Sequence, residues 1–198
     1  MDAVPKARLE AFADGIFAIA ATLLTLNLAV NEHSPLAGEL MRIWPGYAAY
    51  AISFTTIGII WMNHHLLLHQ ISHTDRFFLL LNVLFLMLIA FIPFPTRLLA
   101  LYINADGAQA AAFAYGITLT LTAILFNAIW RYAAWGRRLI RQDADARVVS
   151  GIGRSYLPGP FIYLAATLVA LVSPQVSAGL YAAIAVFYVL ESSVFGRE

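Results

Sequence analysis

The sequence predicts an all-α integral membrane protein, a bundle of six transmembrane helices that forms a single domain over residues 1–198. Two observations predict this class. Of the 198 residues, 61% are hydrophobic and 12% are charged, whereas a soluble globular domain has about half apolar and about a quarter charged residues. Six stretches also reach the roughly 20 apolar residues that a bilayer core of about 30 Å requires.

Short polar connections separate the predicted spans. The stretches NEHSPLAGE, SHTDR, NADG and SPQVS follow the first, second, third and fifth spans, and their Gly, Pro, Asn and Ser residues are typical of turns. The fourth connection, 131–154, is long and charged, and we expect an amphipathic extension of the fourth helix on one membrane face. The prolines of FIPFPTR must kink or end the third helix, and we expect an end there, with Arg97 reaching the outer surface. The spans are placed near 10–30, 46–68, 77–97, 109–132, 156–174 and 177–195.

The basic residues predict the orientation of the bundle, because cytoplasmic loops retain Lys and Arg. With the N-terminus inside, ten of the twelve Lys and Arg residues, Arg197 among them, lie inside, and Arg42 and Arg97 lie outside. An even number of spans places both termini in the cytoplasm of a multi-pass protein of the cell inner (plasma) membrane. The near-neutral charge suggests no nucleic-acid partner, and the absence of cysteine excludes disulfides and thiol catalysis.

The first span carries a helical face with two possible meanings. Ile19, Leu23 and Leu26 follow an i, i+4, i+7 pattern, and Thr22 lies on nearly the same face. One interpretation is a stripe that faces lipid or packs against another helix. The other is a pore lining, where aliphatic rings block ions by dewetting and threonine hydroxyls replace part of a cation's hydration shell. A ring requires several copies around a symmetry axis.

Charged residues at the start of the first span are expected to find partners on neighbouring helices, because ionisable groups in a bilayer are costly. Arg8, Glu10 and Asp14 lie within two turns, and Gly15 permits the close approach of another helix. Snorkelling at the membrane interface is the alternative for Arg8 and Glu10. Asp14 sits deeper, so we expect an Arg, His, Trp or backbone partner for it.

Histidines cluster at the end of the second span, in WMNHHLLLHQISH. His65, His69 and His73 recur every four residues on one face, a spacing that could hold a metal. The remaining histidine outside this cluster, His33, lies in an outer loop, and cysteine is absent. We therefore expect no metal and no other cofactor. Instead, side chains of this segment are expected to hydrogen-bond across helices, namely those of Trp61, Asn63, His64 and His65.

Together these stretches resemble the transmembrane protein 175 family, the endosomal and lysosomal potassium channels and their smaller bacterial relatives. The matching stretches are RLEAFADGIFAI, ISFTTIGIIWMNHH and NVLFLMLIAFIPFPT. In the first, Arg8, Phe12, Asp14 and Gly15 resemble the family's R-x-x-x-F-S-D-G start, and Ala13 departs from it because the family has serine there. The resemblance implies a homotetramer of six-helix subunits in which the first helix of each copy lines a central pore.

The resemblance also implies a function, a potassium-preferring cation channel without a T-V-G-Y-G filter, and not an enzyme. Potassium and other monovalent cations would be the permeant species, and the lipid bilayer and identical copies would be the partners. Ile19, Leu23 and Leu26 would form a hydrophobic constriction, with Thr22 as the hydroxyl layer for selectivity. A buried network would support the pore helix, made of Arg8, Phe12, Asp14, Gly15, Trp61, His64 and His65.

Three other functions are compatible with the same residues. A proton- or cation-coupled secondary transporter would use Asp14 and the helix-two histidines as a relay and would show stoichiometric coupling. A membrane enzyme with a histidine-bound metal would contain stoichiometric metal, and a structural scaffold would carry no ion flux. The membrane character, the lack of cofactor motifs and the family resemblance favour the channel.

Overall fold

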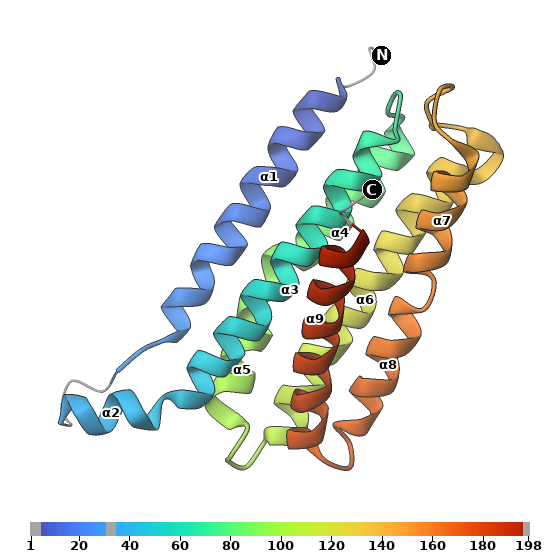
Figure 1. Cartoon of the computed structure of the whole chain (residues 1–198). Coiled ribbons are helices and arrows are strands. Elements are labelled where there is room, and N and C mark those ends of the chain that lie inside the picture. Colours follow the sequence, from blue (N-terminus) through green and yellow to red (C-terminus); the bar gives the residue numbers. More distant parts are fainter. Residues whose placement is uncertain (1–4, 31–34, 196–198) are drawn as a thin grey trace.

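The computed structural model of the chain is an all-helical bundle (Figure 1). It describes residues 5–30 and 35–195, with the surroundings of side chains described through residue 190. His33 and Arg197, which enter the sequence predictions, lie outside the described residues. The described elements are α1 (Lys6–Leu23), the 3-10 turn η1 (Leu24–Asn27), α2 (Leu36–Arg42), α3 (Trp44–His69), α4 (Arg76–Phe91), α5 (Pro93–Tyr102), α6 (Ala108–Ala134), the 3-10 turn η2 (Trp135–Arg137), α7 (Ala146–Tyr156), α8 (Gly159–Val169) and α9 (Pro174–Phe195).

Four helical segments of the described chain are long and apolar enough to cross a membrane: Lys6–Asn27, Trp44–His69, Arg76–Tyr102 and Ala108–Arg137. The shorter helix α9 is also apolar over Pro174–Leu190. Long segments run up and down the bundle, so that the connections 70–75 and 135–145 lie at the end where α1 begins (Figure 1). The connections 103–107 and 170–173 lie at the opposite end, as does α2.

The prolines of FIPFPTR divide a helical segment without ending it, so the prediction of a helix end there is wrong. α4 stops at Phe91 and α5 begins at Pro93, while Ile92 between them keeps helical dihedral angles (φ −48°, ψ −41°). Proline is tolerated in the first turn of a helix, because the first N–H groups have no acceptor within the helix. The helical path therefore continues past Arg97 to Tyr102.

The fourth connection is also different from the expected extension of a helix lying on the membrane face. α6 ends at Ala134, and Gly136 and Arg137 then take positive φ values of 60° and 54°. An α-helix of L-residues cannot continue through such angles, so the chain reverses. A separate helix, α7, begins after Asp145, whose side chain caps Arg147 N, and stands end to end with α8 beside α6 (Figure 1).

Packing of α1 against the bundle positions the candidate site. Helix α1 contacts α3 and α4, and its 3-10 turn contacts α3 and α5, while α6 occupies the centre and contacts α4, α5, α8 and α9. Near the start of α4, backbone bonds join the two connections at one end of the bundle. Ser72 N donates to Leu139 O at 2.8 Å, and Arg141 N donates to Gln70 O at 2.9 Å.

Candidate functional site

Helix α1 has one packed face, which fixes the direction of all its side chains. Its buried residues lie three or four positions apart, the spacing of a single helical face. They are at most 5% exposed, and they pack into the core of the bundle. The residues of this packed face are Leu9, Ala13, Phe17, Ala20 and Leu24.

The four candidate pore residues lie away from the packed face. Ile19 is 60% exposed, Leu23 40% and Leu26 71%, and Thr22 is exposed as well. At about 100° per residue, Thr22 points to the side opposite the centre of the packed face. Within one chain this apolar face therefore has no packing partner, and it is available to lipid or to another copy.

Thr22 presents its hydroxyl oxygen outward. Its Oγ1 donates to the Ile19 carbonyl one turn earlier at 2.9 Å, so the proton is used within the helix. A hydroxyl oxygen has two lone pairs, and these remain to accept from water or to contact a cation. Thr25 Oγ1 similarly donates to the Thr22 carbonyl at 2.6 Å. Since α1 tightens to a 3-10 turn after Leu23, Leu26 follows a different helical pitch from Ile19 and Leu23.

Two hydrogen bonds connect the predicted supporting residues to neighbouring helices. Trp61 Nε1 on α3 donates to Asp14 Oδ1 at 2.8 Å, which gives the carboxylate one of the partner types expected for it, although both side chains are exposed in the single chain. His64 Nε2 lies 2.9 Å from Asn82 Oδ1 on α4, and its ring stacks on Phe85 at 5.3 Å between centroids. The first bond anchors α1 to α3, and the second anchors α3 to α4.

The remaining members of the predicted network do not join these bonds within one chain. Arg8, Phe12, Gly15 and His65 are exposed, and a Cβ placed on Gly15 would meet no described atom within 4 Å. The expectation of one buried network of seven residues is therefore wrong for the single chain. The physical reason is the direction of α1, whose packed face turns Arg8, Phe12 and Gly15 outward.

Sequence reasoning missed buried polar residues that tie the long helices together. Asn82, beside His64, also donates from Nδ2 to the Phe78 carbonyl at 2.8 Å. A second set of buried hydroxyls joins α3, α5 and α6. Ser53 Oγ lies 2.8 Å from Thr96 Oγ1 and 3.0 Å from Tyr115 Oη. A lone asparagine within the apolar run RFFLLLNVLFLML was a signal available in the sequence, because such a group needs a partner in a membrane.

The histidine cluster does not stay on one helical face. α3 ends at His69, so His73 lies beyond the helix, where its Nδ1 is 2.8 Å from Ser72 Oγ. Asn63 Oδ1 accepts from Tyr156 Oη at 3.5 Å, while His65 stays at the surface. Among the described residues, no three His, Cys, Asp or Glu side chains gather in a group that could hold a metal ion.

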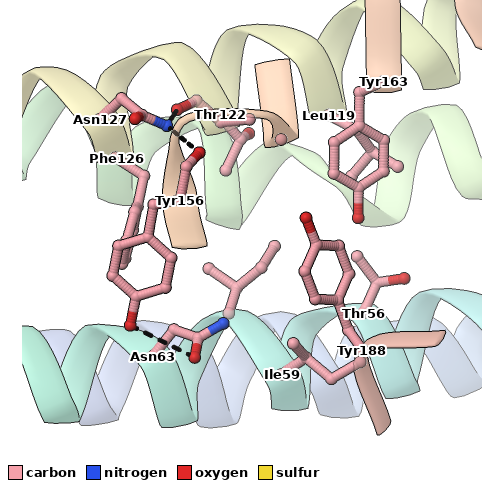
Figure 2. A pocket seen from close by; sticks show the side chains of 13 residues that line it. Thr56, Ile59, Asn63, Leu119, Thr122, Phe126, Asn127, Tyr156, Tyr163 and Tyr188 are labelled. Atoms are coloured by element: carbon pink, nitrogen blue, oxygen red, sulfur yellow. Dashed lines mark hydrogen bonds between the residues drawn. The ribbon is translucent and has the colours of Figure 1, made fainter. Parts of the chain in front are cut away.

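A small cavity of about 70 Å³ lies inside the bundle, between α3, α6, α8 and α9. The hydroxyls of Tyr163 and Tyr188 point toward one another across it (Figure 2). On another wall, Asn127 Nδ2 donates to the Tyr156 carbonyl at 2.9 Å. No described residue of α1 lines this cavity, so the cavity is separate from the candidate pore face.

Comparisons with known proteins agree with the family named from the motifs. The family described as "Endosomal/lysosomal potassium channel TMEM175" matches residues 8–93. A protein of Chamaesiphon minutus named as a potassium channel is 40% identical over 191 residues, covering 94% of each chain. A protein of Streptomyces collinus with a similar name is 35% identical over 185 residues, covering 91% of this chain and 90% of that one.

A solved structure agrees with the fold as well. The crystal structure of "a lysosomal potassium-selective channel TMEM175 homolog" from Chamaesiphon minutus superposes with a TM-score of 0.86 at 38% identity. The match covers 94% of this chain and 97% of that one, so it extends over α1 and the helices that hold it. On these sequence and structural matches, the chain belongs to the TMEM175 family of ion channels.

Proposed function

We propose that this chain is the subunit of a potassium-preferring cation channel that assembles as a homotetramer, with α1 of each copy lining a central pore. The observation that carries this proposal is the face of α1 that holds Ile19, Thr22 and Leu26. This face is exposed, although the opposite face of the same helix is fully packed. The relatives named as potassium channels support the choice of ion.

In this proposal six segments cross the inner membrane, with both termini in the cytoplasm. The four long apolar segments supply four of them, the fifth lies near 156–174 and contains α8, and α9 is the sixth. The orientation is supported by Arg137, Arg138 and Arg141, which lie in the connection at the end of the bundle where α1 begins. Basic residues are retained on the cytoplasmic side.

The proposed path has two kinds of ring. Ile19, Leu23 and Leu26 from each copy form hydrophobic constrictions, which hold back hydrated ions because a narrow apolar passage excludes water. Thr22 supplies a ring of hydroxyl oxygens whose protons are already donated to the Ile19 carbonyls. These oxygens replace part of the hydration shell of a potassium ion. Potassium is the permeant species, and no cofactor takes part.

The contacts behind α1 hold the pore face in position. The Trp61–Asp14 bond fixes the helix to α3 on one flank, and the buried His64–Asn82 pair keeps α3 in register with α4. Because α1 packs on both of these helices, a change in either contact would move the pore face. Arg8, Phe12 and Gly15 are left outside these contacts, and we assign them to the interface between copies.

Replacement of Thr22 tests the selectivity role directly. Thr22→Val keeps the shape of the side chain but removes the oxygen, whereas Thr22→Ser keeps the oxygen. Under bi-ionic conditions in reconstituted membranes, Thr22→Val is expected to move the reversal potential toward equal potassium and sodium permeability. Thr22→Ser is expected to stay near the parent value. Equal reversal potentials for the parent and Thr22→Val would remove Thr22 from the proposed role.

A further inference from the structure

The helices α6 and α7 run beside one another at the end of the bundle where α1 begins (Figure 1). A second hollow, an open cleft of about 630 Å³, lies between them and is lined from both helices and from the turn after α6. It is distinct from the pore face, because no described residue of α1 lines it. The described lining residues include two arginines and two tryptophans and no carboxylate, namely Asn127, Trp130, Arg131, Tyr132, Ala134, Trp135, Arg137, Ala146, Val149, Ser150 and Gly153.

The floor of this cleft carries a hydrogen-bond donor without a partner. Trp130 is 3% exposed, and its Nε1 makes no hydrogen bond to any described residue. Gly153 on α7 lies against this nitrogen, since a Cβ placed there would be 3.2 Å from Nε1. No described buried side-chain nitrogen or oxygen is both sealed from solvent and unpaired, so the indole N–H keeps contact with solvent. It can therefore donate to water or to a ligand in the cleft that Trp130 lines.

The two arginines of the cleft carry charge that no described carboxylate neutralises. Arg131 is exposed and makes no ion pair or hydrogen bond with a described residue. Arg137 Nη2 donates to the carbonyls of Arg141 at 3.1 Å and Ala144 at 2.9 Å, which fixes the guanidinium at the cleft without cancelling its charge. Arg137 also holds a φ of 54°, a backbone conformation that L-residues other than glycine rarely adopt.

Asp75, a carboxylate near the cleft, is bonded to residues that neighbour it. Asp75 accepts from Tyr132 Oη at 2.6 Å and lies 3.5 Å from Arg138 Nε. Burial raises the pKa of Asp75, but hydrogen bonds from Tyr132 and Phe78 and the charge of Arg138 outweigh it and lower the pKa overall, so this carboxylate remains charged and bound to its own partners.

Asp143 and Asp145 also make hydrogen bonds with groups outside the lining of the cleft. Asp143 pairs with Arg141 through Nη2 at 2.6 Å, and Asp145 caps Arg147 N at 2.7 Å. The described lining of the cleft therefore has two arginines and no carboxylate, which favours an anion.

From this cleft we infer a binding site for the phosphate of an anionic lipid headgroup. Guanidinium groups bind phosphate oxygens through paired donors, and the Trp130 N–H supplies a further donor. Trp135 at the rim is 80% exposed and Val148 beside the cleft is 47% exposed, so apolar surface lies next to the basic site, as an acyl chain requires. Basic pockets and exposed tryptophans at the cytoplasmic membrane surface are typical of lipid contact.

The test is a thermal-shift titration of the detergent-purified full chain with dioctanoyl phosphatidylglycerol. The parent protein is expected to melt at rising temperature as this lipid is added, because a ligand of the native state stabilises it. Arg131→Gln is expected to weaken the apparent Kd about tenfold, the effect of losing one charge-assisted hydrogen bond. Trp130→Phe replaces the indole by a smaller aromatic ring without an N–H, so it is expected to weaken the same binding. The matched control is Arg154→Gln, an exposed arginine of α7 outside the cleft, which is expected to bind like the parent.

Two comparison ligands distinguish the sources of the phosphate. Dioctanoyl phosphatidylcholine is expected to give a much smaller shift, and inorganic phosphate at the same concentration is expected to give none. A shift with inorganic phosphate equal to that with phosphatidylglycerol would assign the site to a soluble anion and overturn the lipid assignment. Equal shifts with the two lipids, or parent-like binding by both Arg131→Gln and Trp130→Phe, would overturn the site itself. None of these outcomes depends on ion conduction.

Discussion

His64 and Asn82 bond to each other where α3 packs on α4, and both side chains are at most 2% exposed. Phe17 from α1 lies against the same histidine, with ring centroids 5.8 Å apart. This polar pair therefore stands directly behind the helix that presents the candidate pore face. A buried polar pair of this kind is sensitive to the loss of one partner, because the group left behind cannot reach water.

Asn82→Leu is expected to lower the free energy of unfolding by about 1–3 kcal/mol, because it leaves the His64 nitrogen buried and unpaired. The double variant His64→Leu/Asn82→Leu removes both polar groups and is expected to recover part of this loss. Chemical denaturation of the detergent-solubilised protein, followed by circular dichroism, measures both values. A double variant no more stable than Asn82→Leu would contradict the assigned role of the unpaired nitrogen.

Ile19→Ala is expected to raise single-channel conductance, because a shorter side chain widens the apolar ring and lowers its barrier to water and ions. Planar-bilayer recording in symmetric potassium solution measures the change. Met87→Ala is the control, since Met87 is 59% exposed on α4 and lies away from the proposed pore. A conductance for Ile19→Ala that equals that of Met87→Ala would count against the hydrophobic ring.

The sequence identified Asp14 and Trp61 as residues that bond across helices. It did not show that their hydrogen bond is separate from the one that His64 makes. Helical spacing predicts which residues share a face of one helix. The spacing does not predict how the helix is rotated about its axis relative to its neighbours. This rotation of α1 places Arg8, Phe12 and Gly15 on the outer side. Asn82 carried a readable signal as a lone amide in an apolar run, yet the choice of His64 as its partner depends on the packing of α3 on α4.

At the level of the elements, the apolar lengths predicted helical segments well and their ends less well. Proline at FIPFPTR was compatible with either an end or a break, and the α-helical angles at Ile92 let the helical path continue through a break. The end of α6 depends on positive φ values at Gly136 and Arg137. An arginine in a sequence does not predict a positive φ value. Residue type alone therefore did not predict the boundary between α4 and α5 or the end of α6.

The contact of α6 with α8 and α9 depends on a small residue. A Cβ on Gly116 would clash with Tyr181 Oη and Thr167 Oγ1 and would lie 2.8 Å from Tyr181 Cζ. Gly116→Ala is therefore expected to lower the free energy of unfolding by about 1–3 kcal/mol through overpacking, measured by chemical denaturation in detergent. Gly179→Ala on α9 is the matched control, because a Cβ there meets no described atom within 4 Å. Equal stabilities of the two variants would contradict this close approach.

For the whole molecule, a single chain of this fold has no described passage along α1. The 70 Å³ cavity is separate from α1, and the exposed face of that helix has apolar side chains with no partner in the chain. An ion path along this face therefore needs further copies to enclose it. The pattern of the first span raised this possibility alongside lipid contact, and the exposed face of α1 is compatible with both.

If the exposed face of α1 lines the ion path, a thiol placed on this face is reached by water-soluble reagents from the path itself. The chain contains no cysteine, so Thr22→Cys introduces the sole thiol, and Met87→Cys on α4 provides the control. A positively charged, water-soluble methanethiosulfonate reagent is applied to reconstituted channels from both sides while potassium current is recorded. With α1 lining the path, the potassium current is expected to fall rapidly for Thr22→Cys and to stay unchanged for Met87→Cys. A Thr22→Cys channel that conducts unaltered current throughout exposure to the reagent would contradict this role of α1.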